Sequence, residues 1–269
     1  MRRGSLPHQI NMVPSLVNDC LDKGGSIHPL LISPELTKHL SLCNASILEL
    51  KKNSRYLLNI RWVSYYLHHC ENNQKYQTPW GPLNYVRPDC DGRLRTENYI
   101  CDLNLESMSP ENPRKIDESK FPVPQEWDFV GAEDLRLTEW EGKIYGSGVR
   151  RFFPDGRGRM QVSSLSVNKD KATEEERFFI EAPSDVNSYC EKNWMPLTDS
   201  PFSYLKWCTP LEVVEADLSR TITPSRDYPV IDPTNNTVKP IANLCPSRTR
   251  IVRPNKFPEG LEPRGGSQV

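Results

Sequence analysis

Apolar residues recur along this chain in short runs that a polar cluster divides in two, and this pattern appears three times. The dividing clusters are typical of turns: Lys51-Lys52-Asn53-Ser54, Glu141-Gly142-Lys143 and Thr198-Asp199-Ser200-Pro201. Two short strands joined by a polar turn form a β-hairpin. The sequence therefore predicts three hairpins, with first strands at 47–50, 135–140 and 195–197 and second strands at 57–60, 146–149 and 205–208.

Each predicted hairpin opens with a polar residue, and these openers are Asn44, Glu133 and Lys192. A tyrosine follows twelve positions after each opener, at Tyr56, Tyr145 and Tyr204. Repeated all-β units at tens of residues indicate a β-propeller, in which the innermost strand of each blade faces a central channel. We therefore expect the three openers to converge on one pocket.

Two of the three units also share an arginine at the end of the second strand. Arg61 and Arg150 lie seventeen positions after their openers, whereas the third unit has Thr209 there. In a propeller these guanidinium groups would lie near the openers. The repeated tyrosines are expected in the core, because aromatic residues in strands are mostly buried.

The remaining segments extend this plan. Alternating stretches at 99–105, 160–167 and 211–217 predict outer strands. Polar, proline-rich stretches at 70–91 and 107–125 predict inserted loops. We expect residues 1–43 to form an entry segment, with a short helix from Ser33 toward Leu40, and residues 44–269 to form the propeller.

Composition is compatible with one large all-β domain or two small ones. The chain has 269 residues, of which 36% are hydrophobic, and a mean hydropathy of -0.63. Its 24 prolines exceed its 14 glycines, which favours short strands and irregular connections over helices. The eight cysteines form no CxxC pair, so reduced and mostly buried thiols are expected.

Charge excludes several classes of partner. The 34 Lys and Arg residues nearly balance the 35 Asp and Glu residues, so no overall field attracts nucleic acid or anionic lipid. The arginines between 248 and 264 lack interleaved aromatic residues, which argues against nucleic-acid binding.

With no apolar run after Met1-Arg2-Arg3 and no membrane-length segment, the chain is expected to be soluble and cytoplasmic. No ligand cluster predicts a metal, because the adjacent His68 and His69 would point to opposite faces of a strand.

Three motifs in order resemble a known family: Gly131-Ala132-Glu133-Asp134-Leu135-Arg136, Lys192-Asn193-Trp194 and Arg264-Gly265-Gly266-Ser267. They are similar to glycoside hydrolase family 130, the five-bladed β-propeller family of inverting β-mannoside phosphorylases, and to related mannosyltransferase/phosphorylases. In that family a Gly-x-Glu-Asp-Pro-Arg motif opens the second blade, a Lys-Asn motif the third and a Gly-Gly-rich strand the fourth. Leu135 departs from the family's proline. The resemblance implies a five-bladed propeller truncated within the fourth blade.

The residues of these motifs suit glycoside chemistry. Glycoside cleavage needs proton delivery and a nucleophile, and a phosphorylase uses bound phosphate as the nucleophile. We expect Asp134 to manage the proton, since alternation places it on one face with Arg136 and opposite Glu133. Because cations would hold Asp134 ionised, the resemblance implies a proton relay through a sugar hydroxyl.

The remaining roles follow from the same chemistry. We expect phosphate to be bound by Arg61, Arg136, Arg150 and Lys192, and sugar by Asn44, Glu133, Asn193 and Trp194. Inorganic phosphate is then a co-substrate, the partner is an oligosaccharide or glycoside, and neither a cofactor nor a metal is required.

Other interpretations stay open at this level. Asp134 and Arg136 could form an intrastrand ion pair, Arg61 and Arg150 could be surface charges, and Trp194 could belong to the core. The same fold could also carry a nucleotide-sugar-dependent glycosyltransferase, a glycoside hydrolase or a non-catalytic glycan-binding propeller.

Overall fold

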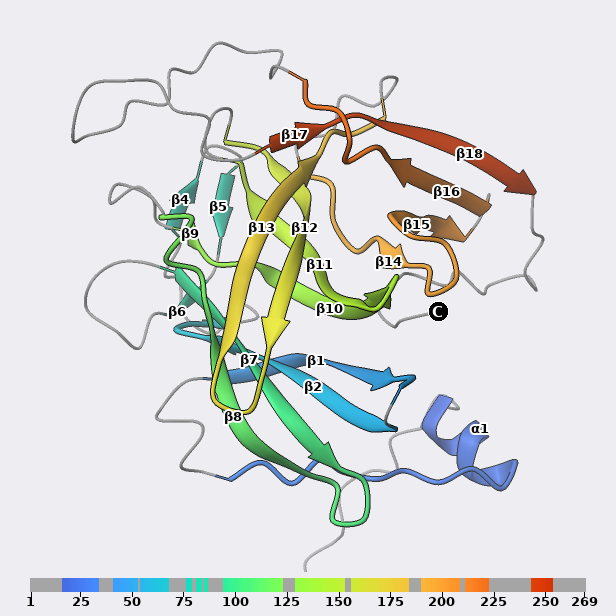
Figure 1. Cartoon of the computed structure of the whole chain (residues 1–269). Coiled ribbons are helices and arrows are strands. Elements are labelled where there is room, and N and C mark those ends of the chain that lie inside the picture. Colours follow the sequence, from blue (N-terminus) through green and yellow to red (C-terminus); the bar gives the residue numbers. More distant parts are fainter. Residues whose placement is uncertain are drawn as a thin grey trace, which may run out of the picture.

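The computed structural model of the chain is almost entirely β (Figure 1). It describes residues 16–33, 41–52, 54–67, 76–78, 81–83, 85–86, 94–122, 129–152, 156–183, 190–208, 211–222 and 243–253. Its described helix is α1 (Leu16–Asp22). The predicted helix from Ser33 toward Leu40 lies mainly outside the described residues.

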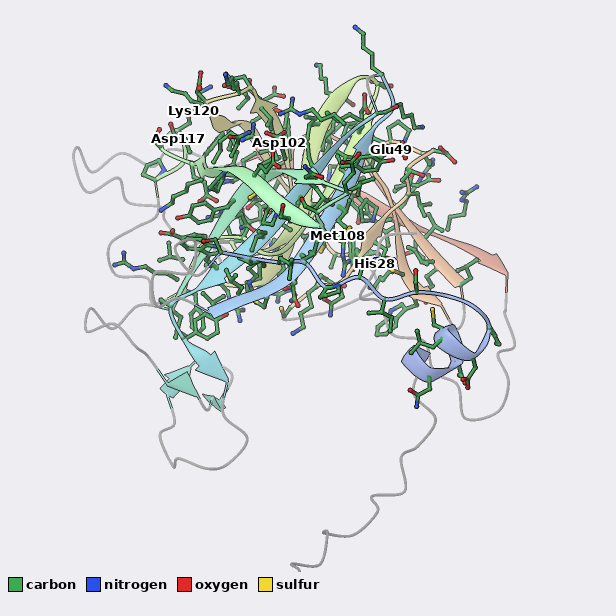
Figure 2. All side chains as sticks on the ribbon, turned by 90° about the horizontal axis from the view of Figure 1, so that it is seen from below. His28, Glu49, Asp102, Met108, Asp117 and Lys120 are labelled. Atoms are coloured by element: carbon green, nitrogen blue, oxygen red, sulfur yellow. The ribbon has the colours of Figure 1, made fainter. Side chains whose placement is uncertain are left out.

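The first four long strands form an antiparallel sheet, here called the first meander. Its strands are β1 (Ser41–Leu50), β2 (Arg55–Val63), β7 (Leu94–Asn104) and β8 (Ser109–Asp117). Along most of β7 buried and half-buried side chains alternate, as expected for a strand with two unequal faces. Its hairpin tips near Glu49 and Met108 lie at the end opposite Asp117 (Figure 2).

Strand β8 corrects the expectation of a loop at 107–125. Pro110 and Pro113 lack the N–H group of a ladder donor, which made the stretch resemble a loop. In the structure both prolines lie where β8 pairs with β7 on one side, and β8 reaches a second partner strand only at Ile116 and Asp117. A strand with one neighbour tolerates proline at positions where the missing N–H would face the open side, because no ladder bond is lost there.

The second meander has the same plan. It comprises β10 (Glu133–Trp140), β11 (Lys143–Arg151), β12 (Gly158–Val167) and β13 (Ala172–Ile180). A third meander comprises β14 (Met195–Pro196), β15 (Ser203–Cys208), β16 (Leu211–Ala216) and β18 (Ser247–Arg253). All three predicted hairpins and the three predicted outer strands are therefore confirmed.

Short strands complete the described structure. Strand β9 (Phe129–Val130) runs parallel to β7, and β17 (Asn243–Cys245) runs parallel to β13. Two small antiparallel sheets pair β3 (Tyr66–Leu67) with β6 (Tyr85–Val86), and β4 (Tyr76–Thr78) with β5 (Gly81–Leu83). Strands β4, β5 and β6 fall inside the stretch 70–91, for which the sequence predicts a loop.

The first two meanders join into one nearly closed, barrel-like sheet of eight strands. Strands β8 and β13 pair in parallel at one junction. At the other, β1 and β10 lie side by side, and the Leu137 N–H donates to the Ser46 hydroxyl at 3.0 Å. The all-β class is thus confirmed, whereas a five-bladed propeller stays a prediction.

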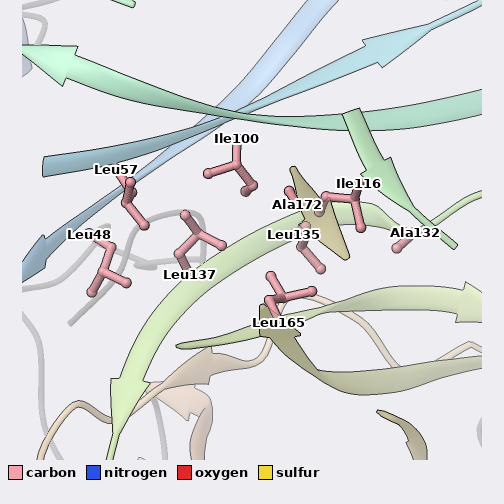
Figure 3. Close-up of a cluster of buried hydrophobic side chains, with 9 residues drawn as sticks. All are labelled: Leu48, Leu57, Ile100, Ile116, Ala132, Leu135, Leu137, Leu165 and Ala172. Carbon is pink, nitrogen blue, oxygen red and sulfur yellow. The ribbon is translucent and has the colours of Figure 1, made fainter. Parts of the chain in front are cut away.

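Apolar side chains fill the spaces between meanders. Leucine and isoleucine residues of β1, β2, β7 and β8 pack against Leu135, Leu137 and Leu165 of the second meander (Figure 3). An aromatic cluster around Trp140, Trp194 and Tyr204 joins the second meander to the third. Burial of apolar area of this kind is the main stabilising contribution to an all-β fold.

Candidate functional site

The first strands of the first two meanders each contain a bulge near their start. The β1–β2 register shifts between Cys43 and Ser46, and the β10–β11 register shifts between Glu133 and Arg136. Within these bulges Asn44 has φ 45° and Asp134 has φ 55°. Asn and Asp are the side-chain-bearing residues that best tolerate this left-handed backbone, so the residue types suit the geometry.

The third meander repeats this feature. Asn193, with φ 65°, lies two residues before Met195, which pairs with Leu205. The corresponding pairs in the other meanders are Ser46 with Asn59 and Arg136 with Ser147. The structurally equivalent openers are therefore Asn44, Asp134 and Asn193.

This equivalence corrects the register taken from the sequence, which aligned Asn44 with Glu133 and Lys192. Four residues lie between paired Leu50 and Arg55 in the first hairpin, but two lie between Trp140 and Lys143 in the second. Because the turns differ in length, equal spacing to the tyrosines does not mean equal position. The equivalent of Arg61 is Val149, and alternation directs Arg150 to the other face.

Two hairpins meet at the carboxylate of Asp134. The Asn44 side-chain amide donates to Asp134 Oδ1, and Arg61 Nη1 donates to the same oxygen at 2.5 Å. Asp134 is 21% exposed and Arg61 is 7% exposed, so a buried cation holds a carboxylate that still reaches solvent. The expectation that Asn44, Arg61 and Asp134 come together therefore agrees with the geometry.

Arg61 also contacts Glu133, Tyr65 and Thr96. Its Nη2 lies 3.4 Å from Glu133 Oε2 and donates to the Tyr65 hydroxyl at 2.8 Å and to the Thr96 hydroxyl at 3.4 Å. Burial lowers the pKa of Arg61, but Tyr65, Glu133 and Asp134 raise it by more, so it lies above the ordinary value.

Glu133 and Asp134 both contact the guanidinium of Arg61, so the expectation that they point to opposite faces is wrong. Strict alternation fails here because the bulge and the left-handed backbone at Asp134 turn both carboxylates toward Arg61. Glu133 is 41% exposed, and Asn44 is exposed as well. The site formed by Asn44, Arg61, Glu133 and Asp134, called the candidate site below, therefore opens to solvent.

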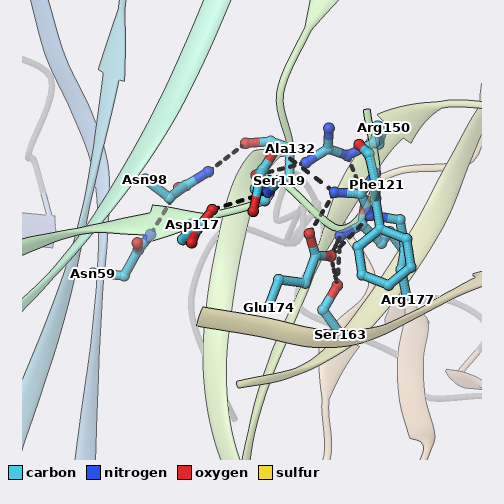
Figure 4. A network of polar contacts seen from close by, with 12 residues as sticks. Asn59, Asn98, Asp117, Ser119, Phe121, Ala132, Arg150, Ser163, Glu174 and Arg177 are labelled. Atoms are coloured by element: carbon cyan, nitrogen blue, oxygen red, sulfur yellow. Dashed lines mark hydrogen bonds and ion pairs between the residues drawn. The ribbon is translucent and has the colours of Figure 1, made fainter. Parts of the chain in front are cut away.

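Two asparagines hold the backbone on either side of Asp134. Asn98 donates to the Ala132 carbonyl at 2.8 Å, and Asn59 donates to the Leu135 carbonyl at 3.0 Å and to Asn98 at 3.1 Å (Figure 4). Both asparagines are buried. Sequence reasoning missed them, because they come from neighbouring strands of the other meander and no spacing rule connects them to Asp134.

Arg136 links the candidate site to the third meander. Its Nη1 donates to the Trp194 carbonyl at 2.9 Å. Burial lowers the pKa of Arg136, and the nearby Asp134 offsets part of that shift. Arg136 therefore lies near Asp134, and its bond to the Trp194 carbonyl also fixes the backbone next to Asn193.

The Lys-Asn-Trp segment divides between surface and core. Lys192 and Asn193 are exposed, whereas Trp194 is 1% exposed and its indole N–H donates to Glu191 at 3.0 Å. Burial raises the pKa of the Cys190 thiol, Arg151 and Lys192 lower it, and Glu133 and Glu191 raise it. The ring of Trp194 packs in the aromatic core and presents no face for stacking on a sugar.

Arg150 lies in a separate buried network. It donates to Gln161 Oε1 at 2.5 Å and to Glu118 Oε1 at 2.7 Å. Arg177 lies 3.6 Å from the other oxygen of Glu118 and pairs with the buried Glu174. This cluster, drawn in Figure 4, joins the end of β8 to the second meander. The structure does not bring Arg150 to Asp134.

Within the described ranges, no three His, Cys, Asp or Glu side chains gather as a metal would require. The same residues contain no helix with the length and apolar character needed to cross a membrane.

Comparison of the chain with protein-family models, with curated proteins and with solved structures found no match.

Proposed function

We propose that this protein is a carbohydrate-active enzyme that cleaves β-mannoside-like glycosides by inverting phosphorolysis, or runs the same reaction toward synthesis. The observation that carries the proposal is the meeting of two hairpins at one carboxylate, where Asn44 and Arg61 both donate to Asp134. A carboxylate beside buried guanidinium groups and open to solvent suits a sugar and an anionic co-substrate together.

In the proposed reaction, an oxygen of inorganic phosphate attacks the anomeric carbon while the glycosidic C–O bond breaks. Inversion converts the β-glycoside into an α-configured sugar 1-phosphate. The proton passes from Asp134 through a sugar hydroxyl to the leaving oxygen. Asp134 ends as the carboxylate, and Asn44 and Arg61 stabilise that product form by hydrogen bonding.

The other roles follow from position and charge. Arg61, Arg136 and Lys192 bind phosphate in this proposal, and Asn44, Glu133 and Asn193 bind sugar hydroxyls. Arg150 is left out because its guanidinium binds Glu118 and Gln161 in a network separate from Asp134. Trp194 is left out because its ring is buried.

The proposal extends to the architecture. We infer that the three meanders are consecutive blades of a five-bladed propeller. Support comes from their common plan, since each has four antiparallel strands and each is preceded or begun by a left-handed Asn or Asp.

The test is to incubate the protein with β-linked mannobiose, with and without phosphate, and to quantify α-mannose 1-phosphate. We expect release only with phosphate, and Asp134→Asn should lower the rate by about 100-fold or more, the usual scale for loss of a general acid. Asp199→Asn is the matched control, because the Asp199 side chain is 91% exposed. That variant should retain the full rate.

Different outcomes reject the proposal in different ways. Free mannose formed without phosphate would identify a hydrolase. A nucleoside diphosphate that raises the melting temperature more than phosphate does would favour a nucleotide-sugar-dependent transferase. Sugar binding without any turnover would identify a glycan-binding protein in which Asp134 only pairs with Arg61.

A further inference from the structure

A cavity of mixed polar and apolar lining lies where β7 begins and β8 ends. Asp117 marks this end of the sheet, which is opposite the hairpin tips near Glu49 and Met108 (Figure 2). The volume of the cavity is about 520 Å³, within the roughly 300–1,000 Å³ typical of small-molecule sites. Residues 95–98 of β7, residues 115–119 at the end of β8, and Val130 line it. The first meander and the strand leading to β10 thus supply its walls.

The walls of this cavity are bonded to the groups that hold Asp134. Thr96 accepts from Arg61 Nη2 at 3.4 Å, and Arg61 binds Asp134 directly. Asn98, another wall residue, donates to the Ala132 carbonyl, two residues before Asp134. A ligand in the cavity would therefore lie beside the candidate site and contact the same supporting residues.

The charges of the cavity favour a neutral ligand over an anion. Lys115 is paired with Glu97 at 2.5 Å, and Glu118 lies 2.7 Å from Arg150, so these charges are largely compensated. The other charged residues of the lining are Arg95 and Asp117, which have opposite signs. The lining therefore presents no net positive charge to phosphate or a nucleotide.

A sugar ring matches the mixture of groups that remains. Carboxylates accept hydrogen bonds from hydroxyl groups, and the Thr96 and Ser119 hydroxyls can both donate and accept. Ile116 and Val130 add apolar surface, which suits the C–H face of a pyranose. A polyol satisfies these groups without bringing a charge into the cavity.

We propose that this cavity is a subsite for a neutral hexose unit of the glycoside, adjoining Asp134. The inference rests on the proposed function, because it assigns part of the same substrate to a second location. The hexose in this subsite stays next to Asp134, while phosphate binds on the Arg61, Arg136 and Lys192 side.

A second cavity, which has a mostly polar lining, supplies the control. It has a volume of about 570 Å³ and is lined by residues of the third meander and its connections, including Ser200, Glu215 and Arg248. None of the hydrogen bonds described for its lining leads to Arg61 or Asp134. A sugar that merely prefers polar hollows would bind there as well.

The experiment is an isothermal titration with β-linked mannobiose in phosphate-free buffer. Ser119 is exposed at the first cavity, so Ser119→Trp fills it without disturbing the core. We expect this variant to weaken mannobiose binding by about tenfold or more, the loss that goes with about 1.4 kcal/mol of contact. Ser200→Trp, which fills the second cavity, should change the affinity by less than about twofold.

Two further measurements make the outcome decisive. Asp117→Asn keeps the size of the exposed Asp117 side chain. Its mannobiose affinity provides an independent measurement if Ser119→Trp unfolds. Phosphate affinity should stay unchanged in both variants. Wild-type affinity for mannobiose in Ser119→Trp, an equal loss in Ser200→Trp, or no binding by the wild type would overturn the subsite.

Failure of the subsite and failure of the proposed function are distinguishable. If mannobiose binds as expected but no sugar 1-phosphate forms, the subsite stands and phosphorolysis fails. If phosphorolysis proceeds and Ser119→Trp leaves its KM unchanged, phosphorolysis stands and the subsite fails.

Discussion

At the scale of single residues, the candidate site depends on left-handed backbone at two polar positions. Asn44 and Asp134 both have positive φ, and their side chains meet across the β1–β10 junction. In a regular strand the residues before and after Asp134 would share one face and Asp134 the other. The bulge removes this restriction and lets neighbouring side chains converge.

Substitution at Asn44 separates the backbone contribution from the hydrogen bond. Asn44→Gly keeps the left-handed backbone accessible but removes the donor to Asp134, which should lower the free energy of unfolding by about 1 kcal/mol. Asn44→Ala removes the same donor but keeps a Cβ that is strained in the left-handed conformation, so it should be less stable than Asn44→Gly by about 1 kcal/mol. Urea denaturation measures both values.

If Asn44→Ala proved as stable as Asn44→Gly, the left-handed conformation at this position would be wrong. Phosphate binding provides the second readout. Both variants should bind phosphate alike, because the proposed phosphate ligands are Arg61, Arg136 and Lys192.

At the scale of elements, the entry into β10 positions the Glu133-Asp134 pair. Gly131 has φ 101°, and a Cβ there would lie 1.9 Å from the Thr96 carbonyl oxygen. The chain therefore passes so close to β7 that only glycine fits. This close approach also allows Asn98 to reach the Ala132 carbonyl.

Gly131→Ala is expected to destabilise the fold strongly. A contact of 1.9 Å forces the β9–β10 connection away from β7, so we expect a loss of about 3 kcal/mol or more in the free energy of unfolding. Gly142→Ala is the matched control. Gly142 also has positive φ, 74°, but a Cβ there meets no atom within 4 Å.

The control variant should lose only about 1 kcal/mol, from the left-handed backbone alone. Thermal and urea denaturation compare the two. Equal losses would mean that backbone conformation and not the close approach requires glycine at 131.

At the scale of the whole molecule, buried ion pairs join the first two meanders. Glu118 follows β8 and contacts Arg150 of β11 and Arg177 of β13. Arg177 also lies over the Phe121 ring at 4.7 Å. The segment beside the proposed sugar cavity is thereby fixed to the second meander.

This junction predicts a pH dependence of stability. Burial raises the pKa of Glu118, but Arg150 and Arg177 lower it by more, so it lies below the value of 4.5 expected for an unperturbed glutamate. A lowered pKa in the folded state contributes stability above the unfolded pKa, and this contribution is lost as pH falls through the folded pKa. Glu118→Gln should therefore be less stable than wild type at pH 7, by about 2 kcal/mol.

The difference should shrink as pH falls below about 4.5 and disappear at still lower pH. Unfolding free energies of both proteins between pH 7 and pH 3 measure it, with the exposed Glu106→Gln as control. A difference that grows on acidification would contradict the assignment of Glu118 as an ionised partner of two arginines.

Local patterns predicted the elements well because they depend on neighbouring residues. The three hairpins and the outer strands at 99–105, 160–167 and 211–217 were correct, since alternation and turn residues act over a few positions. Strand β8 was missed because its prolines suggested a loop, and only its one-sided pairing explains them.

The candidate site was predicted in part. Asn44, Arg61, Glu133 and Asp134 do meet, although the spacing that suggested it was offset by one residue in two units. Arg150 has the same spacing as Arg61 but lies elsewhere, because the second hairpin turn is two residues shorter. Asn59, Asn98 and Thr96 carry no sequence signal, since they reach the site from adjacent strands.

The amino-acid sequence by itself determined the class of the fold and the hairpins, because side-chain alternation and turn chemistry are local properties. Only the tertiary structure decided which polar residues share a carboxylate. Bulges, left-handed residues and turn lengths shift each strand's register, and one position of shift exchanges the two faces of a strand. Contacts between meanders then select which side chains meet.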